Sequence, residues 1–208
     1  MNLEKIDAQG RYCNYPGITI IAKINQKDEN FWQKVQQIIS QPMLAKQYYT
    51  PLPYQSYHMT TIRLFNRAEC GQADWQALLI SYKPFFKKLF DYLQQNQFTP
   101  EITLQEVSIS ETLHLSVSFP TNQNEHIMKM AEEFDLLGNI HRPFHITFGY
   151  LYKDIPLAHK QSLLLEINEN LDSLFRHNGR LFTLNSPSLC IYKDMTNFLD
   201  WNGEKHPF

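Results

Sequence analysis

The chain has 208 residues, of which 43% are hydrophobic and 19% charged, and its formal net charge is −2. This length fits one large domain or two small ones, and it can bury a core without disulfides or metals. The near-neutral charge excludes a chain-wide basic surface for long duplex nucleic acid, but it allows a phosphodiester to bind in a local pocket. The 3 cysteines have no metal-ligand spacing, so we expect free thiols.

Hydrophobic periodicity predicts alternating strands and helices in the first half of the chain. A β-branched run at residues 17–24 predicts a strand, and residues 28–40 carry an apolar stripe at helical spacing. Residues 56–65 predict a second strand. Residues 73–94 predict a helix, which Pro84 should kink or split into two shorter ones.

The second half continues this alternation. Elements are expected, in chain order, as strands at residues 104–109 and 113–119, a helix at 122–137, a strand at 144–152, a helix at 156–175, and strands at 181–184 and 189–192. Gly138 should stop the helix that precedes it. The order of elements indicates an α+β fold, and the lack of a linker predicts a single two-lobed domain over residues 1–208.

The expected localisation and partners rest on features that the sequence lacks. The chain has neither a leader-like apolar run near its start nor a stretch long enough to span a membrane. We therefore expect a cytoplasmic protein with no membrane partner. We also expect a monomer with no long duplex nucleic acid as partner.

Each half carries a His-x-Thr triplet in a predicted strand. His58 and Thr60 are two residues apart and point to one face, as do His145 and Thr147. One neutral and one protonated imidazole can act as general base and general acid on a phosphodiester, with a bell-shaped pH–rate profile that peaks near neutrality. The threonine hydroxyls can donate hydrogen bonds to phosphate oxygens. This chemistry needs no cofactor or metal, although each triplet alone also fits ordinary half-buried strand residues.

Further residues are candidates for substrate binding. Arg142 and Arg63 each offer a guanidinium fork to phosphate, and surface exposure is the alternative interpretation for both. Tyr57 and Tyr150 offer rings on which a base could stack, and core packing is the alternative for both.

Two other histidines do not predict a site. A metal site on His141 and His145 is disfavoured because Pro143 prevents a helix, and an extended segment would place the two histidines roughly 13 Å apart. His114 has no partner at motif spacing, so we expect it to be structural or solvated.

The segments YHMTTI, FHITFGY and SPSLCIYKDM resemble the two-histidine (2H) phosphoesterase superfamily, from about Tyr15 to about Phe198. That superfamily includes the LigT-like RNA phosphodiesterases and the cyclic nucleotide phosphodiesterases, and this chain is most similar to a little-characterised branch. The resemblance implies two pseudo-symmetric lobes, each an antiparallel sheet with outer helices, and an active-site cleft between the sheets. It also implies a metal-independent phosphodiesterase that cleaves an RNA end, an oligonucleotide or a cyclic phosphate, with His58 and His145 as the catalytic residues.

Two rival interpretations remain at this point: a non-catalytic nucleotide- or phosphate-binding module on the same cleft, and an interaction scaffold in which the triplets are incidental. The presence of both histidines and both threonines argues against a simple binder, which needs only donors. The sequence leaves open which histidine is the acid and which the base. It also leaves open which bond is cleaved: 2′–5′, 3′–5′, 2′,3′-cyclic or ADP-ribose cyclic phosphate.

Overall fold

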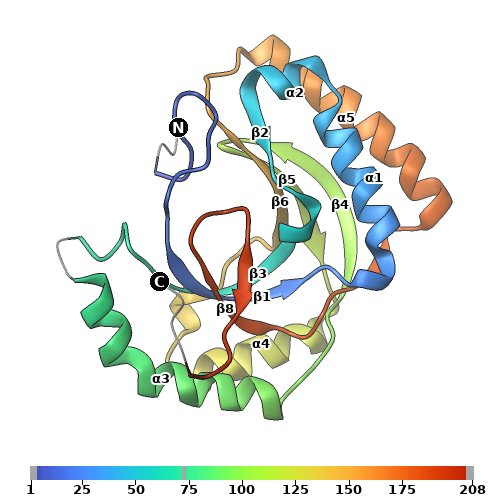
Figure 1. Cartoon of the computed structure of the whole chain (residues 1–208). Helices are drawn as coiled ribbons and strands as arrows, with labels where there is room; N and C mark the ends of the chain where they lie inside the picture. Colours follow the sequence, from blue (N-terminus) through green and yellow to red (C-terminus); the bar gives the residue numbers. More distant parts are fainter. Residues whose placement is uncertain (1–3, 72–73, 205–208) are drawn as a thin grey trace.

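The computed structural model of the chain describes residues 4–71 and 74–204, and its strands form one strongly curled sheet (Figure 1). The strand order is β7-β4-β5-β6-β3-β1-β8-β9, with β2 paired to β6, and each of these strand pairs is antiparallel. The strands are β1 (Gly17–Lys23), β2 (Tyr49–Pro51), β3 (His58–Asn66), β4 (Glu101–Ile109), β5 (Thr112–Ser118), β6 (His145–Leu151), β7 (Leu181–Thr183), β8 (Ser188–Tyr192) and β9 (Phe198–Asp200).

Two lobes meet at the centre of this sheet. One lobe contains β3, β1, β8 and β9, and the other contains β6, β5, β4 and β7 with the short β2. The lobes are joined where β3 pairs with β6, through Met59 and Ile146. The expected α+β fold is therefore confirmed, with one difference: the sheets of the two lobes are continuous with one another.

The helices cover the outer sides of the two lobes. They are α1 (Glu29–Ser40), α2 (Met43–Tyr48), α3 (Trp75–Gln95), α4 (Thr121–Glu133) and α5 (Leu157–Asn178). Helices α1, α2 and α5 lie together beyond β4, whereas α3 and α4 lie beyond β1 and β8 (Figure 1). Each lobe therefore takes helices from both halves of the chain. None of the helices in the described part of the chain is long and apolar enough to span a membrane.

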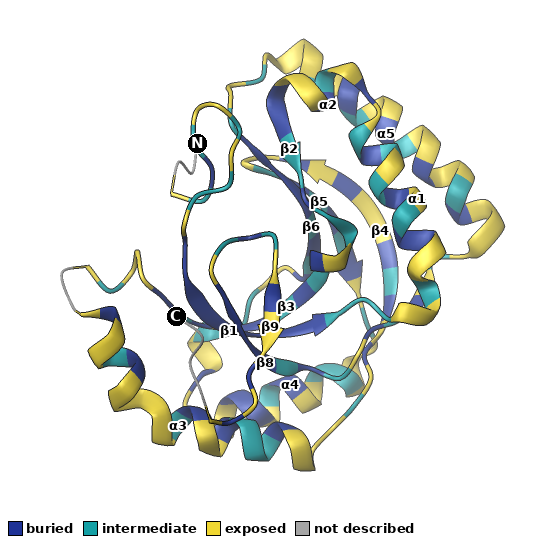
Figure 2. Ribbon diagram, in the orientation of Figure 1, coloured by how far each residue is buried: buried dark blue, intermediate teal, exposed yellow. Residues whose placement is uncertain are grey.

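Burial follows the layers of this arrangement. The helices expose their outer faces, while the strands between the helices and the cleft are mostly buried (Figure 2). Helix α1 buries Phe31, Trp32, Val35 and Ile39, which share one face of the helix. Phe31 stacks on Phe182 of β7 with ring centroids 4.2 Å apart, which fixes α1 against the second lobe.

The structure narrows one helix prediction and contradicts another. Helix α3 continues through Pro84, so of the two expected outcomes, a kink or a split, the split is excluded. Pro84 and the preceding turn at Ile80 are exposed, so water can satisfy the carbonyl that loses its partner. Helix α4 ends at Glu133, before Gly138, because Asp135 adopts φ 56° and turns the chain. The predicted start of α3 at Ala73 lies outside the described residues.

Gly149 of β6 lets the short strand β2 approach. Gly149 pairs with Pro51, and a Cβ at position 149 would lie 2.7 Å from the backbone oxygen of Thr50. That separation is shorter than any van der Waals contact, and backbone atoms cannot rotate away as a side chain can. The glycine is therefore required by the packing of β2 on β6.

We expect Gly149→Ala to destabilise the protein by about 1–3 kcal/mol, because β2 must shift to accept the methyl group. Gly138→Ala is the matched control, since a Cβ there meets nothing within 4 Å. Urea unfolding followed by circular dichroism measures both variants. Equal midpoints for the two would show that β2 moves without cost.

Candidate active site

A cavity of about 360 Å³ lies where the two lobes meet, and both His-x-Thr triplets line it. Its wall includes His58, Thr60, His145 and Thr147. The middle residues of the triplets, Met59 and Ile146, are fully buried on the opposite face of the sheet. The structure therefore brings together the four residues that the strand parity predicted to face one way.

The two imidazoles are anchored in the same manner. The Nδ1 atom of His58 lies 2.6 Å from the carbonyl oxygen of Ser56, and that of His145 lies 2.9 Å from the carbonyl oxygen of Pro143. A carbonyl only accepts hydrogen bonds, so Nδ1 carries the proton in each neutral ring. Each Nε2 is then the atom left to accept or deliver a proton.

The surroundings of His58 keep it neutral. Burial lowers the pKa of His58 to about 4, and the charges of Lys23, His145 and Lys5 act in the same direction. The ring of Phe198 on β9 covers this imidazole, with centroids 4.2 Å apart. The Ser56 carbonyl opposes the shift, because it favours the protonated ring, but burial is the larger effect.

His145 lies between two further histidines, contrary to the expectations for both. The rings of His114 and His141 lie 4.7 Å and 4.9 Å from that of His145, measured between centroids. The estimate of roughly 13 Å for an extended segment is wrong, because the chain bends at Arg142 and Pro143. His114 is also not isolated, because β5 pairs with β6 and places it opposite Thr147.

Burial lowers the pKa of His141 to about 4, and it also lowers that of His114. Both rings are thus held neutral beside His145. Among residues 4–71 and 74–204, no three His, Cys, Asp or Glu side chains are arranged to hold a metal ion.

A β-bulge follows each triplet at the same position. The register of β3 against β1 shifts at Thr61, and that of β6 against β5 shifts at Phe148, each three residues after the histidine. An extra residue reverses the alternation of side chains beyond it. Arg63 and Tyr150, each five residues after the histidine, consequently line the cavity.

Of the additional binding candidates, the structure places Tyr150 and Arg63 in the cavity wall. Tyr57 is fully buried on the other face of β3 and packs against Phe148, with ring centroids 4.9 Å apart. Arg142 turns outward and donates a hydrogen bond of 2.8 Å to Asn124 of α4. Neither Tyr57 nor Arg142 lines the cavity with the triplets, because each side chain points away from the cavity.

Several residues of the cavity wall were not among the candidates. Lys5, Tyr15 and Tyr192 also line it. Tyr192 and Tyr15 belong to the segments that carry the family resemblance, which was an available signal. Lys5 belongs to no motif, so it could not be found from spacing.

Residues 5–117 match the family model 2H-phosphodiest, described as a domain of unknown function (DUF1868). Because the match covers more than half of the chain, the protein belongs to this 2H phosphodiesterase family. This membership places it among proteins of phosphodiesterase type.

The individual relatives share little sequence identity with this chain. Uncharacterized protein 127L of Invertebrate iridescent virus 6 is 26% identical over 223 residues, which cover 93% of this chain and 92% of the viral protein. A conserved protein of unknown function, ATU0111 from Agrobacterium tumefaciens str. C58, superposes with a TM-score of 0.72 at 18% identity, covering 95% of this chain and 89% of its own. Apo LigT of E. coli has a TM-score of 0.54 at 9% identity, covering 91% and 96%. The structural likenesses show a shared fold.

The pKa of His58 gives a testable pH dependence. In the unfolded chain a histidine has a pKa near 6.5, whereas folded His58 stays neutral down to about 4. Between these values the unfolded state binds a proton that the folded state does not. Stability should therefore be constant with respect to this group above about pH 6.5 and fall as the pH drops toward 4.

NMR titration of the ring Hε1 protons measures this directly. The signals of His58 and His141 should have midpoints near pH 4, with assignments made by His58→Asn and His141→Asn. The free energy of unfolding, measured from pH 7 to 5, should fall less steeply in His58→Asn than in the wild type. Midpoints near 6.5 would show that water reaches both rings freely.

Proposed function

We propose that this protein is a metal-independent phosphodiesterase that uses His58 and His145 as its general base and general acid. The observation that supports the proposal is the matched geometry of the two rings. Both line one cavity, and both donate Nδ1–H to a backbone carbonyl, so both have Nε2 available. The two threonine hydroxyls line the same cavity.

His58 is the better candidate for the base in the first step. Its lowered pKa keeps Nε2 unprotonated at neutral pH, as a base requires. For a diester with a neighbouring hydroxyl, His58 takes the hydroxyl proton while the oxygen forms a new bond to phosphorus. The bond from phosphorus to the leaving oxygen breaks, and His145 supplies a proton to that oxygen. Hydrolysis of a cyclic phosphate exchanges these roles, with water as the nucleophile.

Thr60 and Thr147 support the phosphoryl group during this exchange. Each hydroxyl can donate a hydrogen bond to a non-bridging oxygen, where negative charge increases in the transition state. Neither hydroxyl titrates near neutrality, so these donors act at every pH at which the histidines act. The burial of His58 extends the acid limb of the expected bell-shaped profile toward pH 4.

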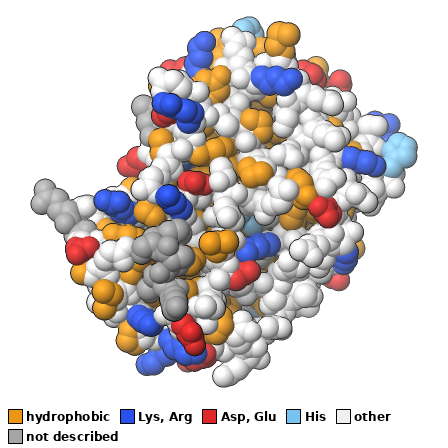
Figure 3. Space-filling view, in the orientation of Figure 1, with side chains coloured by type: hydrophobic (Ala, Val, Ile, Leu, Met, Phe, Trp, Pro, Cys, Tyr) orange, Lys and Arg blue, Asp and Glu red, His pale blue; other side chains and the backbone are white. Residues whose placement is uncertain are grey.

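The surroundings of the cavity support a small substrate. Lys5 and Arg63 line it together with Glu69 and Glu111, so opposite charges are mixed there. On the face shown in Figure 3, Lys and Arg side chains are likewise interspersed with Asp and Glu. A long polyanion prefers a continuous basic surface. We therefore propose an RNA end, a short oligonucleotide or a cyclic phosphate as the substrate.

We expect His58→Ala and His145→Ala each to lower the rate by about 10²–10⁴-fold, because each removes one proton transfer. The double variant should be only slightly slower than either single variant, since the two residues act as a unit. The measurement is product analysis on a panel of 2′–5′, 3′–5′ and 2′,3′-cyclic phosphodiesters, with thermal unfolding as the check on folding.

His177→Ala is the matched control for these variants. Its Nδ1 also contacts a backbone carbonyl, that of Ser173 at 2.8 Å, but the residue is exposed at the end of α5. It should keep full activity. Wild-type turnover in His58→Ala would rule out the mechanism. A wild type that binds nucleotides without any turnover would establish the non-catalytic binding module instead.

Metal chelation and substitution of the two threonines give a second test of the proposed mechanism. Activity should survive EDTA, because protons and hydroxyl groups perform the chemistry. Thr60→Val and Thr147→Val should each cost about 10²–10³-fold in kcat, the usual effect of losing one oxyanion donor, without moving the pH optimum. Thr103→Val, on β4 and away from the cavity, is the control. A strict requirement for a divalent metal would replace this mechanism with a metal-bound hydroxide.

A further inference from the structure

The cavity has a second end, formed where the lobes diverge. Strands β3 and β6 cross at Met59 and Ile146 and run in opposite directions from there. Arg63 and Tyr150 lie four residues beyond the crossing on their respective strands, at most about 13 Å along each. Both line the cavity, which therefore extends well past the phosphate position between the two histidines.

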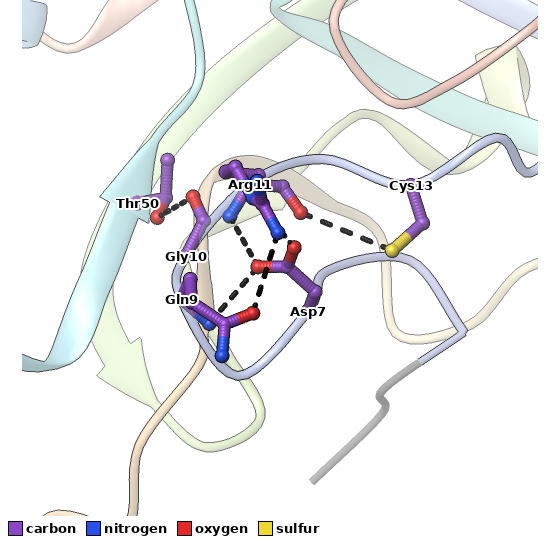
Figure 4. A network of polar contacts seen from close by, with 6 residues as sticks. All are labelled: Asp7, Gln9, Gly10, Arg11, Cys13 and Thr50. Atoms are coloured by element: carbon purple, nitrogen blue, oxygen red, sulfur yellow. Dashed lines mark hydrogen bonds and ion pairs between the residues drawn. The ribbon is translucent and has the colours of Figure 1, made fainter.

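A segment near the N-terminus bridges this diverging end. Residues 4–16, here called the strap, lead into β1 of the first lobe and pass beside β2 of the second (Figure 1). Thr50 Oγ1 of β2 donates to the Gly10 carbonyl at 2.7 Å (Figure 4). Tyr12 Oη donates to the Thr50 carbonyl at 2.7 Å. On the other side, the Tyr15 amide donates to the Lys193 carbonyl at 2.8 Å.

The strap has a defined internal structure. One Asp7 carboxylate oxygen accepts hydrogen bonds from the Gln9 and Arg11 amides, both at 2.9 Å, and Arg11 Nε donates to the other oxygen at 2.8 Å (Figure 4). Ile6 is fully buried, and the Cys13 amide donates to the Lys5 carbonyl at 3.0 Å. The backbone of Lys5 is therefore held in place, which lowers the entropy cost of using its side chain for binding.

Lys5 extends from the strap into the cavity. Its Nζ lies 5.3 Å from the ring centroid of Tyr15 in the strap and 5.4 Å from that of Tyr150 on β6 of the second lobe. Its charge lowers the pKa of His58 and of His141, which places the ammonium near the catalytic end as well.

Acidic groups near Lys5 do not neutralise it by contact. Burial lowers the pKa of Lys5 and Arg63 acts in the same direction, whereas the charges of Glu69, Glu4 and Glu111 raise it. Within residues 4–71 and 74–204, none of the ion pairs involves Lys5. A half-buried ammonium without a paired carboxylate favours an anionic ligand, because a charge-assisted hydrogen bond would compensate its lost hydration.

We propose that Lys5, with Arg63 beside it, binds an anionic group of the substrate other than the scissile phosphodiester. The preferred substrate class is then a nucleoside cyclic phosphate or short oligonucleotide that carries an additional terminal phosphate. Tyr15 and Tyr150 form the walls between the two anionic positions. This inference rests on the proposed function, because it concerns the same cavity.

The test compares a nucleoside 2′,3′-cyclic phosphate with and without a 5′-phosphate. The wild type should prefer the 5′-phosphorylated compound in kcat/KM by about 10- to 100-fold, the usual effect of one charge-assisted hydrogen bond. In Lys5→Gln that ratio should fall to near one, and Lys5→Arg should restore most of it. Lys153→Gln is the matched control, since Lys153 also lies over a tyrosine ring, at 5.9 Å from that of Tyr48, but is exposed away from the cavity.

A wild type without preference, a Lys5→Gln that keeps the preference, or an equal loss on both compounds would each overturn the proposal. If the wild type cleaves neither these compounds nor any member of the phosphodiester panel, the proposed function fails, and binding still decides the role of Lys5. Isothermal titration with a nucleoside 3′,5′-bisphosphate and a 3′-monophosphate should then show tighter binding of the bisphosphate, lost in Lys5→Gln. Equal affinities would overturn the Lys5 site separately.

Discussion

The single pairing of Met59 with Ile146 is the contact on which the rest of this structure depends. It joins β3 to β6 and makes one sheet of two lobes. Both side chains are fully buried, so the residues on either side of each must face the cavity. Because the two strands run antiparallel from this point, the two triplets meet around one position with opposite directions. A shift of this pairing by one residue would turn one triplet away from the other.

Burial has opposite consequences at the two ends of the cavity. At the crossing it keeps His58 neutral, which prepares Nε2 to accept a proton. At the strap, burial deprives the Lys5 ammonium of part of its hydration. None of the ion pairs in the described residues involves Lys5, so the cation remains available for an anion. One cavity therefore separates an end with a neutral imidazole from an end with a cationic side chain. The strap connects them, because it carries Lys5 and is hydrogen-bonded to both lobes.

Sequence periodicity predicted which helices and strands form better than it predicted where they end. Strand alternation correctly placed His58 and His145 with their threonines, because a period of two holds wherever a strand is regular. The same alternation assigned Tyr150 to the core face, and a bulge at Phe148 moved it into the cavity. Pro84 did not split its helix, since an exposed turn tolerates a missing hydrogen bond. Bulges and solvent exposure depend on neighbouring strands and helices, so no local sequence pattern predicts them.

The sequence by itself determined the α+β class, the family and the four residues of the two triplets, because these depend on periodicity and on short motifs. Only the tertiary structure decided what surrounds them. A chain bend and a neighbouring strand bring His141 and His114 to His145. The strap brings Lys5 to a cavity whose two His-x-Thr triplets lie far along the chain. Such contacts depend on how the sheet curls and on which segments bridge its lobes. Because the contacting residues are far apart in the sequence, no spacing pattern predicts these contacts.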